Sequence, residues 1–207
     1  KSTELAALPT LGLWARQVLE LVASRPKIIT FYTSGSTGEP KPIVRDFYFL
    51  EQDAWHLGEM LQGSKHVIGL VPPHHIYGFI YTILIPKVLQ ARRSDQRFRR
   101  PAAIVRDLQP GDAVIGFPHI WQLCAKTKER FPASVIGTTS TGPCPPEIIR
   151  TLRRQGLQTM IEIYGSSESG AMGYRSNLDD PLTLMATWKR LGDDLFVREL
   201  EDGGQSE

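Results

Sequence analysis

Residues 33–41 of the chain read Thr33-Ser-Gly-Ser-Thr-Gly-Glu-Pro-Lys41, and almost all of them are small or turn-forming. Two kinds of residue in this glycine-rich loop suit a bound anion, the glycines Gly35 and Gly38 and the hydroxyl residues Thr33, Ser34, Ser36 and Thr37. Glycine lets the backbone approach a ligand closely, and successive backbone N–H groups in such a turn form an anion-binding concavity. Lys41 adds a point charge suited to phosphate. The loop is therefore predicted to cradle a polyphosphate.

Two other interpretations of the glycine-rich loop stay open on local grounds. A plain hairpin loop is one, because turn chemistry alone selects Gly, Ser and Thr. A phosphotransferase loop is the other, but the G-x-x-x-x-G-K-[ST] pattern opens a helix. Here Lys41 lies between Pro40 and Pro42, a strand is predicted to follow, and Asp46 makes a poor second metal ligand. Without a helix dipole, backbone amides, hydroxyls and Lys41 must hold the charge.

Outside this loop, short apolar strands alternate with segments of helical spacing. Strands are predicted over residues 27–33, 42–45, 67–71, 113–115, 134–137, 159–164 and 195–198, and helices over 5–23, 47–61, 76–89, 102–108, 120–129 and 145–154. The helix over 76–89 is expected to be buried and kinked near Pro86. This alternation predicts an α/β fold in which helices flank a mostly parallel sheet. The arginine-rich run 92–100 is expected to be a solvated loop, with contact to an acidic partner or a ligand phosphate as the alternative.

Composition narrows the class of protein. The 207 residues carry a formal charge of +2 and are 41% hydrophobic, which excludes disorder, collagen and coiled coil as overall descriptions. So small a charge argues against a dedicated nucleic-acid binder. No signal peptide or membrane span is visible, because the most apolar stretch, residues 76–85, has half of the about twenty residues that a span needs. Cys124 and Cys144 fit neither a metal-site spacing nor a disulfide framework, so a reducing, cytoplasmic compartment is expected.

The glycine-rich loop also resembles a family signature. Residues 32–41 are similar to the phosphate-binding string of the adenylate-forming superfamily, the AMP-dependent synthetases and ligases that include acyl-CoA synthetases, aryl-acid ligases, peptide-synthetase adenylation domains and luciferases. Pro42 stands where that family usually has glycine. Three further segments resemble family motifs and follow in the family's order, residues 71–79, 139–143 and 163–170. The resemblance covers residues 28–173. The motifs together are specific to the family, whereas singly only the first of them is.

The resemblance assigns the second and third segments to the acid and adenine pockets. His75 takes the position of the gating residue, and Tyr77 would face the carboxylic acid. A pair of histidines that caps a strand end is the local alternative. Ser140, Thr141 and Gly142 resemble the loop that lines the adenine and acyl pockets, with Pro143 beside the acid. Alone, this segment is a strand-to-helix turn with capping residues.

The fourth segment resembles the family's Tyr-Gly-x-Thr-Glu motif, with Ser167 in place of threonine. The resemblance implies that Tyr164 stacks on adenine, that Gly165, Ser166 and Ser167 border the phosphates, and that Glu168 binds Mg²⁺. Lys41, His75 and Glu168 would be the catalytic residues. A solvent-exposed turn glutamate is the local alternative for Glu168.

The resemblance implies part of a layered αβαβα adenylating domain over residues 1–207, with the C-terminal lid outside this chain. The implied reaction uses ATP and Mg²⁺ to convert a carboxylic acid to acyl-AMP, then to a thioester with CoA or the phosphopantetheine of an acyl carrier protein. The string His75-Ile-Tyr77 resembles that of relatives that take aromatic or phenylpropanoid acids, and this resemblance favours an aryl acid over a fatty acid. Two family features lack a clear counterpart, the lid lysine and the ribose-binding aspartate, which Gly192-Asp193 only mimics. A catalytically inactive nucleotide-binding remnant or scaffold is therefore the alternative.

Overall fold

The part of the chain available for description covers most of its length. The computed structural model describes residues 16–18, 20–21, 23–24, 27–34, 40–199 and 205–206. Much of the helix predicted over residues 5–23 lies outside these ranges, as do residues 35–39 of the glycine-rich loop.

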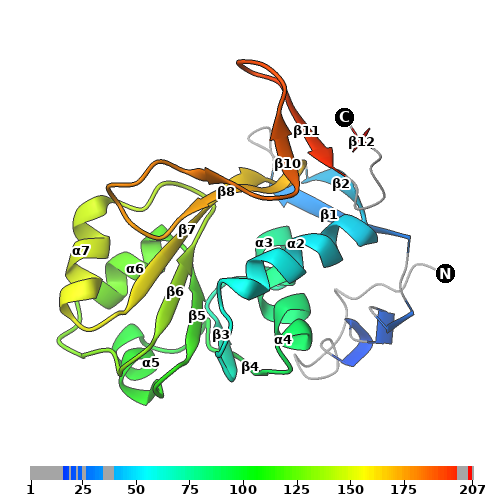
Figure 1. The fold of residues 1–207 in the computed structure, drawn as a ribbon. Coiled ribbons are helices and arrows are strands. Elements are labelled where there is room, and N and C mark those ends of the chain that lie inside the picture. The colour runs from blue at the N-terminus through cyan, green and yellow to red at the C-terminus, as the bar shows by residue number, and fades with distance from the viewer. Residues whose placement is uncertain are drawn as a thin grey trace.

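A seven-stranded sheet forms the centre of the molecule (Figure 1). Its strands, in spatial order, are β4 (Arg92–Asp95), β3 (His66–Gly69), β5 (Ala113–Gly116), β6 (Ile136–Thr139), β7 (Thr159–Ser166), β8 (Gly170–Arg175) and β9 (Thr183–Leu184). The first five strands are parallel, while β8 and β9 add to the sheet as antiparallel neighbours. The predicted α/β fold with a mostly parallel sheet is confirmed.

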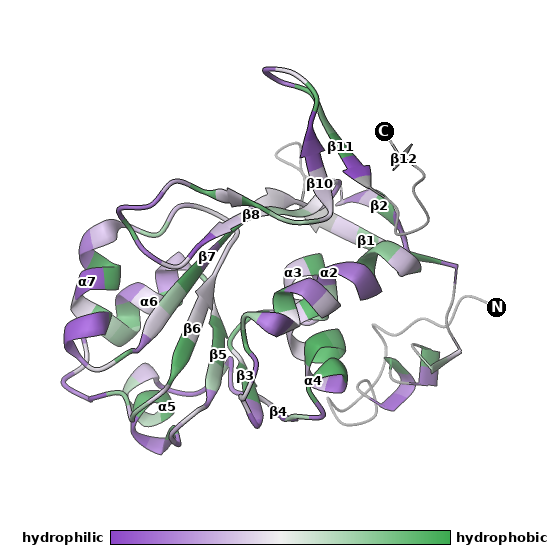
Figure 2. Ribbon diagram, viewed as in Figure 1, coloured by the Kyte–Doolittle hydropathy of each residue, from purple (hydrophilic) through white to green (hydrophobic). Residues whose placement is uncertain are grey.

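Helices cover both faces of this sheet because its strands are apolar on both sides. They are α2 (Phe47–Glu59), α3 (Ile76–Phe79), η2 (Ile80–Leu84), α4 (Ile85–Val88), α5 (Pro101–Asp107), α6 (Pro118–Ala125) and α7 (Pro146–Arg154). Alternate strand residues point to opposite faces: Val67 joins the core under α2 to α4, and Ile68 joins the core under α5 to α7. Ile115 and Val114 divide between the two cores in the same way. Figure 2 shows these hydrophobic strands between the two helical layers.

The buried helix over residues 76–88 contains an irregular turn. Its middle segment, η2, is a π-helix that ends just before α4, whose second residue is Pro86. Proline has no N–H to donate to an α-helical ladder, so an irregularity near Pro86 has a local cause. At the start of the helix, a Cβ on Gly78 would lie 2.1 Å from the Pro72 carbonyl oxygen, so only glycine fits this contact.

Two smaller sheets lie at the side of the central sheet (Figure 1). Strands β1 (Ile28–Ser34) and β2 (Pro40–Asp46) form an antiparallel hairpin. Strands β10 (Trp188–Arg190), β11 (Phe196–Glu199) and β12 (Gln205–Ser206) form an antiparallel sheet. Asp46 ends β2 and caps α2, because its carboxylate accepts a hydrogen bond from Tyr48 N at 2.8 Å. Within the described part of the chain, no helix has both the length and the apolar character of a membrane span.

Three local predictions were wrong. Ser134 was placed in a strand, but its φ of 61° belongs to a turn, so β6 begins two residues later. The helix predicted to reach residue 129 ends at Ala125. The arginine-rich run contains edge strand β4 rather than only a solvated loop, and Asp95 forms an ion pair with Arg97 at 2.7 Å. Edge strands accommodate charged side chains because one of their sides faces solvent.

Both cysteines belong to the core under α5 to α7, and we expect them to resist alkylation. Burial raises the pKa of the Cys124 and Cys144 thiols to about 12, which leaves little reactive thiolate at pH 8. Iodoacetamide at pH 8 should leave both thiols unmodified in the native chain and modify both in 6 M guanidinium, as intact-mass spectrometry would record. Rapid native labelling at either cysteine would contradict the packing described here.

Candidate active site

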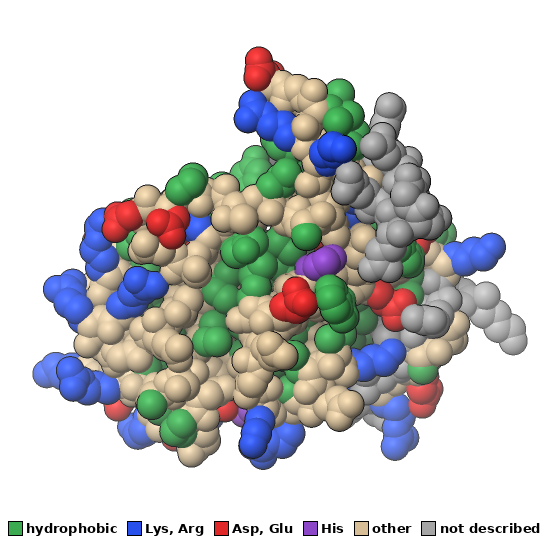
Figure 3. Space-filling view, viewed as in Figure 1, with side chains coloured by type: hydrophobic (Ala, Val, Ile, Leu, Met, Phe, Trp, Pro, Cys, Tyr) green, Lys and Arg blue, Asp and Glu red, His purple; other side chains and the backbone are tan. Residues whose placement is uncertain are grey.

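A cavity of about 210 Å³ lies where α2, the buried helix and the carboxyl ends of β6 and β7 meet the start of β8. Its apolar lining comes from Leu57, Ile76, Ile80, Ile163 and Ala171. Its polar lining comes from Ser140, Thr141, Ser166 and Ser167. Figure 3 shows hydrophobic side chains on the viewed face in this region, between β8 and α2. In open α/β sheets, ligands bind at the carboxyl ends of parallel strands, and this cavity has that position.

Two tyrosines of the buried helix also line the cavity. The Tyr77 hydroxyl lies 2.6 Å from Thr138 Oγ1 and donates a 3.1 Å hydrogen bond to the Gly116 carbonyl oxygen. Its ring lies 4.9 Å from the Tyr81 ring, centroid to centroid. Burial raises the pKa of both phenols above the usual value, so both stay neutral at physiological pH. The predicted acid-pocket residue Tyr77 therefore lines a largely apolar cavity.

The histidine pair lies beside the cavity rather than in its lining. His75 is the N-cap residue of α3, directly before the lining residue Ile76, and its side chain is exposed. The His74 and His75 ring centroids are 4.5 Å apart. Partial burial, and secondarily the charges of His75 and Arg97, lower the pKa of His74, so this imidazole is mainly neutral at pH 7. A gating role for His75 remains a prediction.

The loop after β6 brings two of its four predicted residues to the cavity. Ser140 and Thr141 line it, and the Ser140 hydroxyl donates to the Ile163 carbonyl oxygen at 3.0 Å, which joins the ends of β6 and β7. Thr141 has a φ of 72°, which is uncommon for a residue with a side chain and is frequent at functional sites. Gly142 and Pro143 are exposed and lie outside the described lining.

The Glu168 turn, residues 166–170, connects β7 to β8. The Ser166 hydroxyl accepts hydrogen bonds from the backbone N–H groups of Glu168 at 3.2 Å and Ser169 at 3.1 Å. The hydrogen bond with the Ser166 side chain, together with the Glu168 N–H and the Arg45 charge, lowers the pKa of the exposed Glu168 carboxyl. An exposed, ionised carboxylate is a suitable oxygen ligand for Mg²⁺. Tyr164, which precedes this turn, is also exposed, as a surface for stacking requires.

Among the described residues, no group of three or more His, Cys, Asp and Glu side chains could hold a metal ion. Mg²⁺ usually keeps several waters and binds one or two carboxylates together with substrate phosphates. Glu168 fits that pattern as a single protein ligand, provided that nucleotide phosphates supply the remaining charge.

The glycine-rich loop is described only at its two ends. Gly35, Ser36, Thr37 and Gly38 lie outside the described residues, as do the side chains of Thr33 and Ser34. Lys41 is exposed on β2 and stands opposite Thr33 in the hairpin register. The hairpin therefore places Lys41 directly beside the start of the loop that the sequence assigns to phosphate.

Arg45 joins this hairpin to the Glu168 turn, a contact that the sequence motifs did not reveal. Its guanidinium donates to the carbonyl oxygens of Ser167, Glu168 and Ser169, with 3.2 Å to the first and the last. Arg45 thus brings two motifs together that are more than 120 residues apart in the chain. Gly192 and Asp193, the string that only mimics the ribose-binding aspartate motif, lie apart from the Glu168 turn. They lie between β10 and β11, where Asp193 pairs with Arg190 at 3.3 Å.

Comparison with known proteins identifies the family to which the chain belongs. The model of the AMP-binding enzyme family matches residues 17–193. The chain belongs to the AMP-binding enzyme family. Its relatives in that family include 4-coumarate–CoA ligases of Rhodobacter capsulatus, 35% identical over 90% of this chain, and Cereibacter sphaeroides, 33% identical over 84%. The chain spans 50% and 46% of the length of these two relatives.

Solved structures of the superfamily share the fold. An acyl-CoA synthetase (AMP-forming)/AMP-acid ligase II-like protein of Dyadobacter fermentans matches with a TM-score of 0.70 at 14% identity, over 96% of this chain and 61% of that one. O-succinylbenzoate CoA synthetase of Bacillus subtilis, solved in complex with ATP and magnesium ion, matches with a TM-score of 0.65 at 16% identity, over 86% of this chain and 38% of that one. The predicted adenylating-enzyme architecture, present in part, is confirmed.

Proposed function

We propose that the protein to which this chain belongs uses ATP to activate a carboxylic acid as acyl-AMP and then forms a thioester with CoA. The observation that carries the proposal is the convergence of separate motifs. Tyr77, the loop after β6 and the Glu168 turn border one cavity, and Arg45 attaches the glycine-rich hairpin to that turn. Family membership and relatives that are named as CoA ligases support the same chemistry.

In the first half-reaction, a carboxylate oxygen attacks the α-phosphorus of ATP, the bond to the β-phosphate oxygen breaks, and pyrophosphate leaves. The glycine-rich loop and Lys41 would hold the β- and γ-phosphates, because backbone N–H groups and an ammonium stabilise anionic oxygens. Glu168 would hold Mg²⁺, which offsets charge on the phosphates. Tyr164 would support the adenine, and the cavity would orient the acid, with His75 beside it.

In the second half-reaction, the sulfur of a thiolate attacks the acyl carbon, and AMP leaves with the electron pair of the broken C–O bond. CoA is the proposed acceptor, since the curated relatives are named as CoA ligases. A phosphopantetheine on a carrier protein has the same reacting thiol and is the alternative. We further propose that the chain forms part of the large core domain and that a lid domain completes the site.

The cavity supports an aryl acid as the substrate class. Its volume of about 210 Å³ is below the roughly 300–1,000 Å³ of typical small-molecule sites, so it fits the acyl group rather than the whole of ATP. Aliphatic walls and the Tyr77 and Tyr81 rings favour a flat apolar group. The name 4-coumarate, shared by three curated relatives, describes a molecule of this kind.

Acid-dependent exchange of labelled pyrophosphate into ATP tests the proposal with the whole protein. We expect exchange in the presence of Mg²⁺ and an aryl acid such as 4-coumarate or benzoate, at a higher rate than with octanoate. Absence of exchange with every acid, in a protein that still binds ATP, would contradict the ligase and support a nucleotide-binding remnant or scaffold. Exchange that is fastest with octanoate would contradict the aryl preference alone.

A further inference from the structure

Three buried charged side chains lie together behind the Glu168 turn. Arg45 on β2, Asp53 on α2 and Arg198 on β11 are 6%, 0% and 3% exposed. None of the three is among the described residues that line the cavity. Charged residues are almost never so deeply buried unless they are paired, so their partners indicate what the cluster does.

The Arg45 guanidinium binds the backbone of the Glu168 turn. It donates to three consecutive carbonyl oxygens, those of Ser167, Glu168 and Ser169. A planar guanidinium with fixed N–H directions restrains the orientation of these groups, which a single ammonium could not do equally well. Because Arg45 is also part of β2, the strand that carries Lys41, the position of the turn is set relative to that strand.

The other two members of the cluster, Asp53 and Arg198, form a buried ion pair with each other. Arg198 Nη2 lies 2.6 Å from Asp53 Oδ1 and donates to the Phe49 carbonyl oxygen at 3.0 Å. The guanidinium also packs over the Phe49 ring, 4.6 Å from its centroid. Burial raises the pKa of the Asp53 carboxyl, and the charges of Arg198 and Arg45 oppose this shift. Arg198 therefore fixes the carboxylate that helps to keep the Arg45 charge in the interior.

Gly170 allows this close arrangement. It has a φ of 77°, and a Cβ at this position would lie 2.5 Å from Asp53 Oδ2 and 3.1 Å from Arg45 Nη2. A side chain would displace the carboxylate or the guanidinium, and the left-handed backbone would be strained as well. The end of the turn is thus shaped to receive the buried charges.

We propose that Arg45 is a positioning residue that sets the Glu168 turn against strand β2, so that the proposed metal ligand Glu168 and the proposed phosphate ligand Lys41 face the same nucleotide. The inference rests on the proposed function, since it concerns the binding of Mg²⁺·ATP. It assigns to Arg45 no contact with substrate. Its effect is transmitted through the three turn carbonyls, and Asp53 and Arg198 support it.

The test compares Arg45→Lys and Arg45→Met with Arg175→Met in the whole protein. Arg175 is a matched control because its Nε pairs with Glu162 Oε2 at 2.6 Å across the same β7–β8 pair, away from the buried cluster. Calorimetry would measure ATP affinity over a Mg²⁺ titration and in EDTA, with thermal unfolding in parallel. We expect Arg45→Met to raise the Mg²⁺ concentration for half-maximal enhancement of ATP binding at least tenfold, with affinity in EDTA changed less than threefold. Arg45→Lys should restore part of the metal dependence, and Arg175→Met should match the parent.

Three outcomes would overturn the inference. The first is a parental Mg²⁺ dependence in a folded Arg45→Met protein. The second is an equal loss of affinity with and without metal. The third is unfolding of both Arg45 variants, which would assign Arg45 to stability alone. If the parent itself does not bind Mg²⁺·ATP, the proposed function fails, and the inference fails with it.

Discussion

Replacing Lys41 with alanine should weaken ATP binding roughly 10- to 150-fold, because a hydrogen bond to a charged group contributes about 1.5–3 kcal/mol. The free energy of unfolding should change by no more than about 0.5 kcal/mol, since Lys41 is exposed on a hairpin strand outside the cores. Calorimetric titration with ATP and urea unfolding would measure the two quantities on the same samples. Lys41 pairs with Thr33 in the hairpin register, at the start of the segment that is proposed to hold phosphate.

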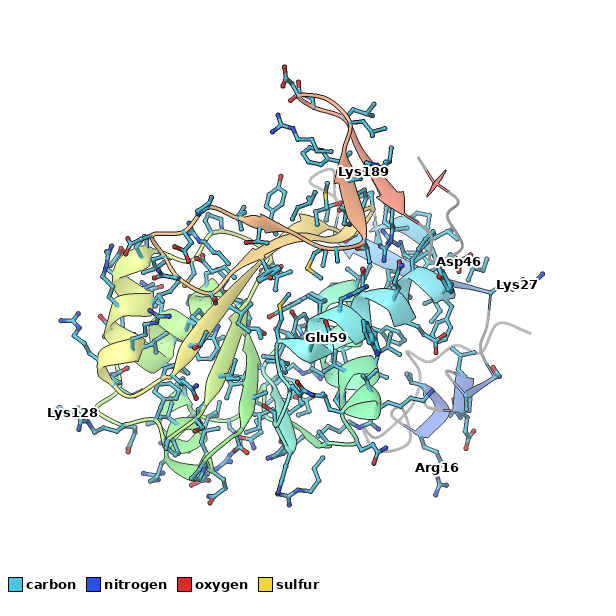
Figure 4. The ribbon with its side chains drawn as sticks, in the orientation of Figure 1. Arg16, Lys27, Asp46, Glu59, Lys128 and Lys189 are labelled. Carbon is cyan, nitrogen blue, oxygen red and sulfur yellow. The ribbon has the colours of Figure 1, made fainter. Side chains whose placement is uncertain are left out.

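Lys128→Ala is the matched control for this prediction. Lys128 is also exposed, and Figure 4 shows it on the opposite side of the molecule from Lys27, next to which β1 begins. Its removal subtracts the same charge without changing the hairpin. Equal ATP affinity in the Lys41 variant and the parent would refute the phosphate role. Equal losses in both lysine variants would indicate only a long-range effect of net charge.

Glu168→Gln should largely remove the Mg²⁺ dependence of ATP binding. The substitution keeps the size of the side chain but removes its charge, and Mg²⁺ strongly prefers carboxylate oxygen. The hydrogen bond with the Ser166 side chain lowers the Glu168 pKa below its usual value, so the carboxyl stays ionised at neutral pH, and the parent should keep its Mg²⁺ dependence from pH 6 to 8. ATP titrations with and without 5 mM Mg²⁺ would check both statements.

The control for Glu168 is Asp179→Asn, an exposed carboxylate in the segment between β8 and β9. It should leave the metal titration unchanged. A Glu168→Gln protein with the metal dependence of the parent would show that another group binds Mg²⁺. Such a result would leave the acid cavity intact as a proposal but would remove Glu168 from the catalytic residues.

The layers of the fold could be predicted because burial leaves a local pattern in the sequence. Val67 and Ile68 are adjacent and both apolar, which is typical of a strand covered on both faces, and the structure confirms this. The order of strands has no such local signal, and neither does the edge strand Arg92–Asp95, whose charges resemble those of a loop. The strand predicted to begin at Ser134 began too early. Ser134 is a turn residue with a left-handed backbone, but it directly precedes the buried Val135, so the apolar pattern did not reveal the turn.

The candidate site was predictable where function depends on contiguous residues and not where it depends on distant contacts. Tyr77, Ser140 and Ser166 were found within motifs, whereas Leu57 and Ala171 reach the cavity only through the packing of α2 and β8. One signal for the buried cluster was available. Asp53 lies on the apolar face of its helix, between Leu50 and Leu57, a position that requires a charged partner. The partner, Arg198, is 145 residues away, so spacing could not identify it.

The proposed function requires that ATP and the organic acid share one continuous site. Calorimetry with a sulfamoyl analogue of 4-coumaroyl-adenylate, which joins the acyl and adenosine groups, tests it most directly. We predict one binding site per chain, at least 100-fold tighter binding than for 4-coumarate or AMP alone, and complete displacement of the analogue by ATP, as expected when two linked groups bind adjacent sites. Simultaneous binding of ATP and the analogue, or an affinity no higher than that of the tighter separate half, would contradict the claim.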